Sequence, residues 1–243
     1  MFKNSTQLVR KSIFPIFYFG QNGQNPSFGV LGTGFFIDDE GHFLTANHVI
    51  EALPKNMNFG YAGNIPNVTK KGAGFNSIRI IASDKSKDLA LGKIDVDKLP
   101  PLKLADRNSV IGESISLCGY PLPVIKPTGK LNTNNGKKVI NLSLDITSVR
   151  QYWQPTIKMD EIKKGLLFGK TFRSFITQHD ALPGMSGGPI FNLKGEVVGV
   201  TSANYTRPVQ RNPKLQINVE NGIGVELSEI KDFLNSNLAK VAA

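Results

Sequence analysis

The stretch Pro183-Gly184-Met185-Ser186-Gly187-Gly188-Pro189 decides how the rest of this chain is interpreted. It places one serine among glycines, directly before the short apolar run 190–191. Glycines allow backbone conformations that are closed to residues with a Cβ, and they let the N–H groups of Gly184 and Ser186 point at one spot. A hydroxyl beside two convergent N–H donors provides a nucleophile and an oxyanion hole, which acyl transfer needs. A glycine-rich turn with an incidental serine is the alternative.

A serine nucleophile needs an imidazole that takes its proton, and the chain has three histidines. His42 directly follows an acidic turn, where we expect it to be exposed at the start of a hairpin. His179 lies too near Ser186 along the chain to be placed independently, although a lining role stays open. His48 follows a predicted strand, at the start of a short helical turn that would hold its side chain in place. Elimination therefore favours His48 as the base, and a structural histidine at a strand end is the alternative.

Short apolar runs between turn residues predict a mainly β chain, and the 24 glycines and 14 prolines agree with this. Residues 139–149 alternate with period two, which is typical of a half-buried strand. Residues 126–138 and 151–170 show no such period, so we expect loops there, the second with at most a helical turn. Ser228 is expected to cap a closing helix. The expected strands are 13–19, 30–37, 42–46, 78–82, 89–94, 113–118, 139–149, 171–177, 189–192, 196–202 and 222–226.

The amino-acid composition indicates in which cellular compartment the protein is expected and which classes of partner it would bind. Cys118 is the one cysteine among 243 residues, so no internal disulfide can form, which fits a reducing compartment. Since residues 13–19 do not resemble a signal peptide either, we expect a cytoplasmic location. No segment reaches about 18 consecutive apolar residues, and we interpret the run 13–19 as a first strand and not as a signal peptide or a membrane segment. The formal charge of +10 would support weak nucleic-acid binding, but the basic stretches lack interleaved aromatic residues. A nucleic-acid partner is therefore not expected.

Three segments resemble the signature segments of trypsin-like serine proteases. They are Thr45-Ala46-Asn47-His48-Val49, Asp88-Leu89-Ala90-Leu91 and Gly184-Met185-Ser186-Gly187-Gly188-Pro189. Their order His, Asp, Ser agrees with that family, as do the separations 88 − 48 = 40 and 186 − 88 = 98 residues. Residues 32–37 and 195–200 provide supporting matches. The resemblance covers roughly residues 28 to 235 and is closest to the protease domain of bacterial Deg/HtrA-type enzymes, without PDZ domains.

The resemblance implies a single peptidase domain over residues 1–243. Its fold would be all-β and chymotrypsin-like, with two six-stranded antiparallel barrels and a C-terminal helix. The N-terminal barrel would span residues 12–105 and carry His48 and Asp88. The C-terminal barrel would span residues 106–226 and carry Ser186, and residues 227–239 would form the closing helix.

The resemblance also implies the chemistry, namely hydrolysis of peptide bonds by a serine endopeptidase through an acyl-enzyme. Ser186 would attack the carbonyl, His48 would transfer the proton, and Asp88 would orient the imidazole. Backbone N–H groups of Gly184 and Ser186 would bind the oxyanion. No cofactor or metal is required, the substrate would be a protein or peptide, and a regulatory protein partner stays open. A catalytically dormant protease-fold scaffold is the alternative function. Rival carboxylates for the orienting role are Asp84, Asp95 and Asp97.

Asp180 carries the predicted substrate preference. It lies six residues before Ser186, a spacing that in trypsin-like enzymes puts an acid at the floor of the primary pocket. Lysine or arginine on the acyl side of the cut would then be preferred. The alternative is an apolar pocket for small aliphatic residues, as in the Deg/HtrA type, with Asp180 a solvated acid that His179 could neutralise. The expected pocket walls are Thr201, Ser202 and Ala203 on one side and Gly222 and Gly224 on the other.

Overall fold

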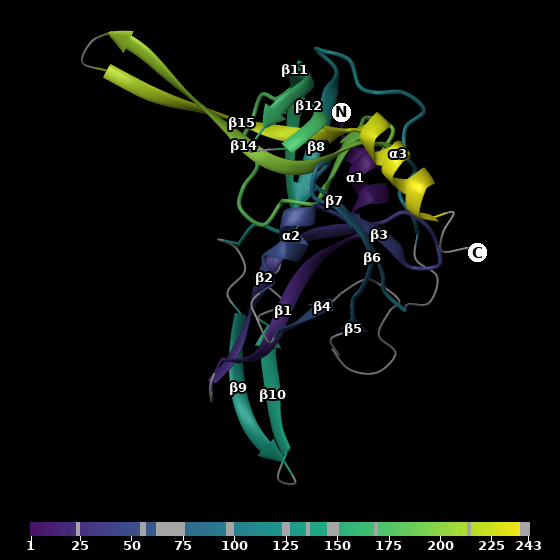
Figure 1. Cartoon of the computed structure of the whole chain (residues 1–243), viewed down its shortest axis with the longest axis vertical. Coiled ribbons are helices and arrows are strands. Elements are labelled where there is room, and N and C mark those ends of the chain that lie inside the picture. Colours follow the sequence, from purple (N-terminus) through teal and green to yellow (C-terminus); the bar gives the residue numbers. More distant parts are fainter. Residues whose placement is uncertain are drawn as a thin grey trace.

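The structure is a computed structural model that describes residues 1–22, 25–53, 57–61, 76–95, 100–122, 127–134, 137–144, 151–167, 170–212 and 215–238. Within these ranges, each pairing between named strands is antiparallel. The strands form a seven-stranded sheet, a closed barrel and a two-stranded hairpin. Figure 1 shows the sheet and the barrel next to each other, with the helix α3 beside the barrel.

The seven-stranded sheet comes from the first half of the chain and has the order β5-β4-β1-β2-β3-β7-β6. Aromatic rings fill its core, where Phe14 lies 4.6 Å from Phe36 and 5.2 Å from Phe43 between ring centroids. All three rings are fully buried, so they hold β1, β2 and β3 together. The strands are β1 (Ile13–Asn22), β2 (Asn25–Phe36), β3 (His42–Thr45), β4 (Met57–Tyr61), β5 (Asn76–Ser77), β6 (Arg79–Asp84) and β7 (Leu89–Lys93).

The closed barrel comes from the second half and has the order β11-β12-β15-β14-β13-β8. Much of its interior is apolar, and this apolar part includes Leu117, Phe175 and Ile190, all fully buried. Closure leaves no free edge within the barrel wall, which is one way in which β proteins avoid pairing with other chains. The strands are β8 (Ser114–Gly119), β11 (Tyr152–Leu167), β12 (Lys170–Thr177), β13 (Pro189–Asn192), β14 (Val197–Asn212) and β15 (Leu215–Glu226).

The predicted all-β class, with two antiparallel units and a C-terminal helix, is confirmed. The second unit has the six strands expected of it. The first unit has seven, because β4 and the two-residue β5 extend the sheet beyond β1. The domain boundaries at 12–105, 106–226 and 227–239 remain predictions.

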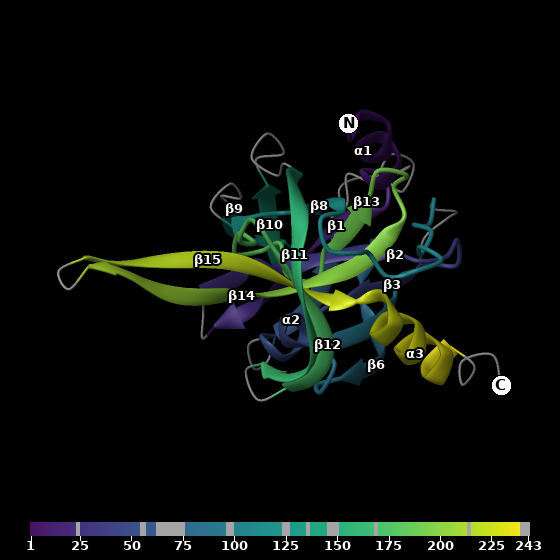
Figure 2. The same cartoon turned by 90° about the horizontal axis from the view of Figure 1, so that it is seen from above.

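Two hairpins project from the body of the molecule (Figures 1 and 2). One consists of β9 (Pro127–Asn134) and β10 (Lys137–Leu144), which pair along their whole length. The other is the outer part of β14 and β15, which remain paired as far as Asn212 and Leu215. The prediction of a loop at 126–138 is wrong in its described part, because the polar residues there form a strand against the alternating residues of β10.

The prediction of a loop at 151–170 is also wrong, because β11 occupies most of this range. Its side-chain pattern is inverted. Thr156 and Lys158 are buried in the barrel, whereas Ile157 and Met159 are exposed. Sequence periodicity assumes apolar residues on the buried face, so a strand that buries a lysine gives no recognisable signal.

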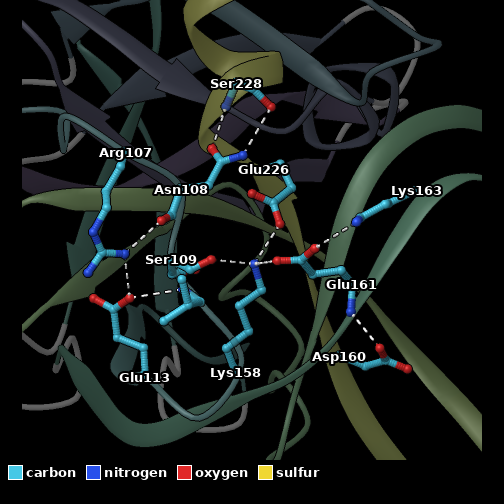
Figure 3. Close-up of polar contacts among 11 residues, drawn as sticks. Arg107, Asn108, Ser109, Glu113, Lys158, Asp160, Glu161, Lys163, Glu226 and Ser228 are labelled. Atoms are coloured by element: carbon cyan, nitrogen blue, oxygen red, sulfur yellow. Dashed lines mark hydrogen bonds and ion pairs between the residues drawn. The ribbon is translucent and has the colours of Figure 1, made fainter.

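Lys158 is accommodated by a polar cluster at one end of the barrel (Figure 3). Its ammonium donates to the carbonyl oxygen of Ser109 (2.7 Å), to Oε1 of Glu161 (2.9 Å) and to Oε1 of Glu226 (2.7 Å). It also lies 5.0 Å from the ring centroid of Phe175. Burying a charge is costly unless it is paired and hydrogen-bonded, and here all three ammonium hydrogens have acceptors. The cluster joins β11 to the end of β15 and to the segment that precedes β8.

The helices are α1 (Lys3–Val9), α2 (Asn47–Glu51) and α3 (Leu227–Leu238). The predicted cap by Ser228 is wrong, because Ser228 lies inside α3 and its backbone N–H donates to Oδ1 of Asn108 (3.1 Å). The predicted exposure of His42 is also wrong. Its side chain is buried, with Nδ1 2.6 Å from Oδ2 of Asp38. No helix in the described ranges is long and apolar enough to cross a membrane.

Candidate active site

His48 and Asp88 come from neighbouring elements of the first unit and are in direct contact. His48 is the second residue of α2, and Asp88 directly precedes β7, the strand that pairs with β3. Nδ1 of His48 lies 2.9 Å from Oδ2 and 3.1 Å from Oδ1 of Asp88. The backbone N–H of His48 also donates to Oδ1 of Asp88 (3.0 Å). The carboxylate thus holds both the ring and the backbone of His48, which leaves Nε2 on the free side of the imidazole.

The two side chains differ in exposure. The side chain of His48 is 37% exposed, while that of Asp88 is 1% exposed. Asp88 also has a positive φ of 56° and is the only described non-glycine residue with one. Such a conformation costs free energy and is found where the surroundings impose it, often at functional sites. A buried carboxylate in a constrained conformation can orient an imidazole that substrate still reaches.

Ser202 of β14 joins this pair to Ser186. The Ser202 hydroxyl donates to Oδ2 of Asp88. The Ser202 carbonyl oxygen accepts a hydrogen bond from the Ser186 hydroxyl (3.4 Å). Within the described residues this carbonyl, and not the imidazole of His48, is the hydrogen-bond acceptor of Ser186 Oγ. The structure therefore gathers His48, Asp88 and Ser186 around Ser202.

Gly187 allows the serine to approach His48. It has a positive φ of 82°, and a Cβ at this position would lie 2.1 Å from Oγ1 of Thr45 and 2.8 Å from the backbone nitrogen of Ala46. These two residues directly precede α2. Only a glycine can bring the backbone after Ser186 so close to the backbone before His48.

The peptide groups of the serine loop, which we define as Pro183–Gly188, are held by specific hydrogen bonds. The accepting carbonyl groups are those of Pro183 (from Leu122 N–H, 2.8 Å), Gly184 (from Thr33 Oγ1, 2.8 Å), Met185 (from Gly188 N–H, 2.9 Å), Ser186 (from Thr33 N–H, 2.8 Å) and Gly188 (from Thr201 N–H, 2.9 Å). The N–H groups of Met185 and Gly187 donate to Leu182 (2.9 Å) and Thr201 (2.7 Å). Two N–H groups have no acceptor among the described residues, those of Gly184 and Ser186. They are the two that the sequence predicts as oxyanion donors.

The residues predicted to line the substrate pocket differ in burial and in what they contact. Thr201 is fully buried beneath the serine loop, so its side chain cannot line an open pocket. A Cβ at Gly224 would meet the rings and methyl groups of the barrel interior, so this residue can offer only its backbone. A Cβ at Gly222 would lie 2.5 Å from Oγ1 of Thr177, next to the segment that leads to Asp180. Ala203 and Asp180 are half-buried, and His179 is exposed.

Asn204 connects the two sides of the predicted pocket, and sequence analysis did not identify it. Its Oδ1 accepts from the N–H of Ala181 (2.7 Å), and its Nδ2 donates to the carbonyl oxygen of the same residue (2.8 Å). Ala181 follows Asp180, whereas Asn204 follows Ala203. The amide therefore bridges the strand β14 and the segment that carries Asp180. A single asparagine gives no sequence signal for such a contact.

Among the described residues, no group of three or more histidine, cysteine or acidic side chains could hold a metal ion.

Comparison with known proteins gives concordant findings. The family model described as "Trypsin-like peptidase domain" matches residues 32–200. Relatives from Halomonas elongata and a Marinomonas species, both named "Probable periplasmic serine endoprotease DegP-like", are 27% and 30% identical over 189 residues. Each alignment covers 77% of this chain and 32% of the relative, so the chain spans about a third of the length of the curated relatives it matches.

A solved structure of the HtrA-type protease AlgW with a decapeptide superposes with a TM-score of 0.67. The superposition covers 98% of this chain and 68% of that chain at 15% identity. At this level of identity the likeness concerns the fold, and it agrees with the predicted chymotrypsin-like class.

The expected cytoplasmic location is wrong on this comparison, because the relatives are named as periplasmic proteins. The expectation depended on interpreting residues 13–19 as a strand and not as a signal peptide, and on the lack of a possible disulfide. Cys118 is buried, and burial raises the pKa of its thiol well above the ordinary value. One buried, protonated thiol is compatible with an oxidising compartment as well as with a reducing one, so the cysteine count carries no information on location here.

Proposed function

Because the chain belongs to the family of trypsin-like peptidase domains, we propose that it is a serine endopeptidase that cleaves protein or peptide substrates through an acyl-enzyme. The observation that supports this proposal most directly is the arrangement of polar groups around Ser186. Ser186 lies beside two N–H groups that have no acceptor among the described residues. Ser202 links Ser186 to the buried carboxylate that holds the imidazole of His48. The family membership agrees with the predicted resemblance to the Deg/HtrA type.

In the proposed mechanism His48 is the general base. Asp88 accepts the hydrogen bond of Nδ1–H, which places the lone pair of the imidazole on Nε2. The Ser186 hydroxyl rotates about χ1 from the Ser202 carbonyl toward Nε2 and transfers its proton as Oγ attacks the substrate carbonyl. Asp88 then stabilises the imidazolium through the same hydrogen bond. The protonated His48 returns the proton to the leaving amine, and a water molecule hydrolyses the acyl-enzyme by the same route.

Gly184 and Ser186 are the proposed oxyanion donors. As the carbonyl becomes tetrahedral, its oxygen gains negative charge, and fixed N–H groups stabilise that charge without reorganisation. Both N–H groups are unbonded among the described residues, while their neighbours in the loop are bonded. Loss of one such donor typically lowers the rate by ~10²–10³-fold.

The names of the relatives support a periplasmic location and protein substrates for this chain. They do not name a regulatory partner, and a dormant scaffold function has no observation in its favour.

The test compares the wild type with Ser186→Ala, in which the nucleophile is lost and the fold is preserved. Wild-type protein should be labelled by a fluorophosphonate probe and should degrade unfolded casein, while Ser186→Ala should do neither. Far-UV circular dichroism and a thermal unfolding curve control for folding. Equal casein degradation by both proteins contradicts the proposal, because the reaction would then not depend on Ser186.

A further inference from the structure

The backbone segment Tyr120–Leu122, which follows β8, lies directly against the proposed oxyanion donor Gly184. A Cβ on Gly184 would be 2.4 Å from the carbonyl oxygen of Tyr120 and 2.8 Å from the backbone nitrogen of Leu122. Gly184 has a positive φ of 96°, so a residue with a Cβ would be strained there in addition. The contact is thus one of backbone against backbone.

One hydrogen bond crosses this contact. The N–H of Leu122 donates to the carbonyl oxygen of Pro183, with a distance of 2.8 Å. That carbonyl belongs to the same peptide group as the N–H of Gly184. A trans peptide is planar, and its C=O and N–H point in opposite directions. The bond from Leu122 therefore turns the Gly184 N–H away from the segment Tyr120–Leu122.

If this peptide group rotated by half a turn, the carbonyl of Pro183 would take the place of the Gly184 N–H. An acceptor would then face the developing oxyanion, where a donor is required. Gly184 places little steric restriction on such a rotation. Within the described residues, Leu122 is the only hydrogen-bond partner of this peptide group. The carbonyl on the other side of Gly184 is fixed separately, by Thr33.

We infer that the backbone N–H of Leu122 is a positioning group for catalysis, which holds the Pro183–Gly184 peptide in the orientation that exposes the Gly184 N–H to the substrate oxyanion. This inference rests on the proposed function. Leu122 touches neither the substrate nor Ser186 in this role. It acts through Pro183.

The segment is itself anchored at Tyr120, which is buried. Its backbone N–H donates to Oγ1 of Thr33 (3.0 Å). Its hydroxyl donates to the carbonyl oxygen of Ile13 (3.2 Å) and accepts from Nε2 of Gln151 (3.0 Å). Burial raises the pKa of this hydroxyl well above its ordinary value, so it remains a donor at neutral pH. The segment that carries Leu122 is therefore anchored by Ile13 and Gln151, which lie outside the serine loop, as well as by Thr33.

The test removes the N–H of Leu122 alone. Leu122→Pro lacks the donor, and replacement of Leu122 by its α-hydroxy acid changes only N–H to O. Leu122→Ala is the matched control, because it shortens the exposed side chain and keeps the N–H. We expect kcat for a peptide substrate to fall by about 10²–10³-fold in the two donor-free variants. KM should change little, and Leu122→Ala should stay within a few-fold of the wild type.

Two further measurements separate positioning from a structural defect. The far-UV circular dichroism spectrum should be the same in all variants, which shows that the fold is preserved. Affinity for a peptide boronate, which forms a tetrahedral adduct with Ser186, should fall with kcat in the donor-free variants only.

If the ester variant folds and keeps the wild-type kcat, the inference is overturned while the proposed function stands. The same holds if Leu122→Ala loses as much kcat as the ester variant, because the side chain would then be responsible. If the wild type itself shows no Ser186-dependent turnover, the proposed function fails, and the inference fails with it.

Discussion

Asn204 bridges the two sides of the predicted substrate pocket, so this single residue bears on the predicted preference for lysine or arginine. Its amide forms two hydrogen bonds to the backbone of Ala181, at 2.7 and 2.8 Å. These bonds join strand β14 to the segment that carries Asp180, the residue predicted to form the floor of the pocket. We expect this bridge to block the path of a side chain as long as arginine to Asp180, whereas alanine or valine needs no such depth.

We therefore predict that peptides with Ala or Val on the acyl side of the cut are hydrolysed with a kcat/KM at least about tenfold above that of the matched Arg peptide. Asn204→Gly removes the bridge and should raise kcat/KM for the Arg peptide. Paired fluorogenic peptides that differ at this one position provide the measurement. The control is Asp180→Ser in the Asn204→Gly background, which should abolish the gain. An Arg preference in the wild type, lost in Asp180→Ser alone, would support the floor predicted from sequence and contradict a closed pocket.

Sequence analysis could identify Ser186, His48 and Asp88 as candidates because their roles depend on side-chain chemistry in recognisable segments. It could not identify Leu122, because a backbone N–H has no residue signature and its partner Pro183 is distant along the chain. Thr33 and Asn204 were missed for a related reason. Their side chains bond to backbone groups, and any residue in the partner position would present the same groups.

Among the elements, β11 shows why a strand can escape sequence analysis. The strand exposes Ile157 and Met159 and buries Lys158. The buried ammonium is stable there because two carboxylates and a carbonyl group surround it (Figure 3). Two of these partners, Ser109 and Glu226, are distant from Lys158 in sequence. The groups that stabilise the buried charge can therefore be identified only in the folded barrel. β3 and β7, by contrast, bury apolar residues and were predicted within about two residues, the usual uncertainty of element ends.

The Lys158 cluster should give the barrel a measurable pH dependence through Glu226. Burial raises the pKa of Glu226 above its ordinary 4.5, and the negative charge of Glu161 acts in the same direction. Together they outweigh the hydrogen bond and charge of Lys158 and the charge of Arg173, which lower this pKa. The folded state then binds the proton more tightly than the unfolded state does. The contribution of Glu226 to stability is therefore fully present below about pH 4.5 and is lost as the pH rises through the raised pKa.

We predict that the difference in unfolding free energy between the wild type and Glu226→Gln shifts in favour of the wild type as the pH falls from about 7 toward 4.5. Glu196→Gln is the control with the opposite sign. Hydrogen bonds from Asn192 and Lys103 lower the pKa of Glu196, so its contribution is lost as the pH falls through that lowered value. Urea unfolding curves at several pH values measure both differences. Parallel pH profiles for the two variants would contradict the assignment to Glu226.

At the scale of the whole molecule, the site forms where the sheet meets the barrel. His48 and Asp88 belong to the first unit and Ser186 to the second, and Thr33 in β2 links them. Its backbone N–H donates to the carbonyl oxygen of Ser186, and its Oγ1 binds both the Gly184 carbonyl oxygen and the Tyr120 N–H. Separate sequence motifs can indicate which residues meet, but the contacts that hold the two units in register appear only after both have folded.

Thr33→Val tests this link with little change in side-chain volume. It removes the hydroxyl and leaves two buried backbone groups, the Gly184 carbonyl and the Tyr120 N–H, without this partner. An unsatisfied buried group costs about 1–3 kcal/mol, so the unfolding free energy should fall by at least that amount. Turnover should fall as well, because the serine loop loses the bond that fixes Gly184.

Thr33→Ser keeps the hydroxyl and is the matched control, so it should remain close to the wild type in both properties. Differential scanning calorimetry measures the stability change, and hydrolysis of a Val peptide measures turnover. A Thr33→Val protein with wild-type turnover but lowered stability would show that Thr33 only joins the two units. The register of the units and the geometry of the serine loop would then be independent, which the shared hydrogen bonds of Thr33 argue against.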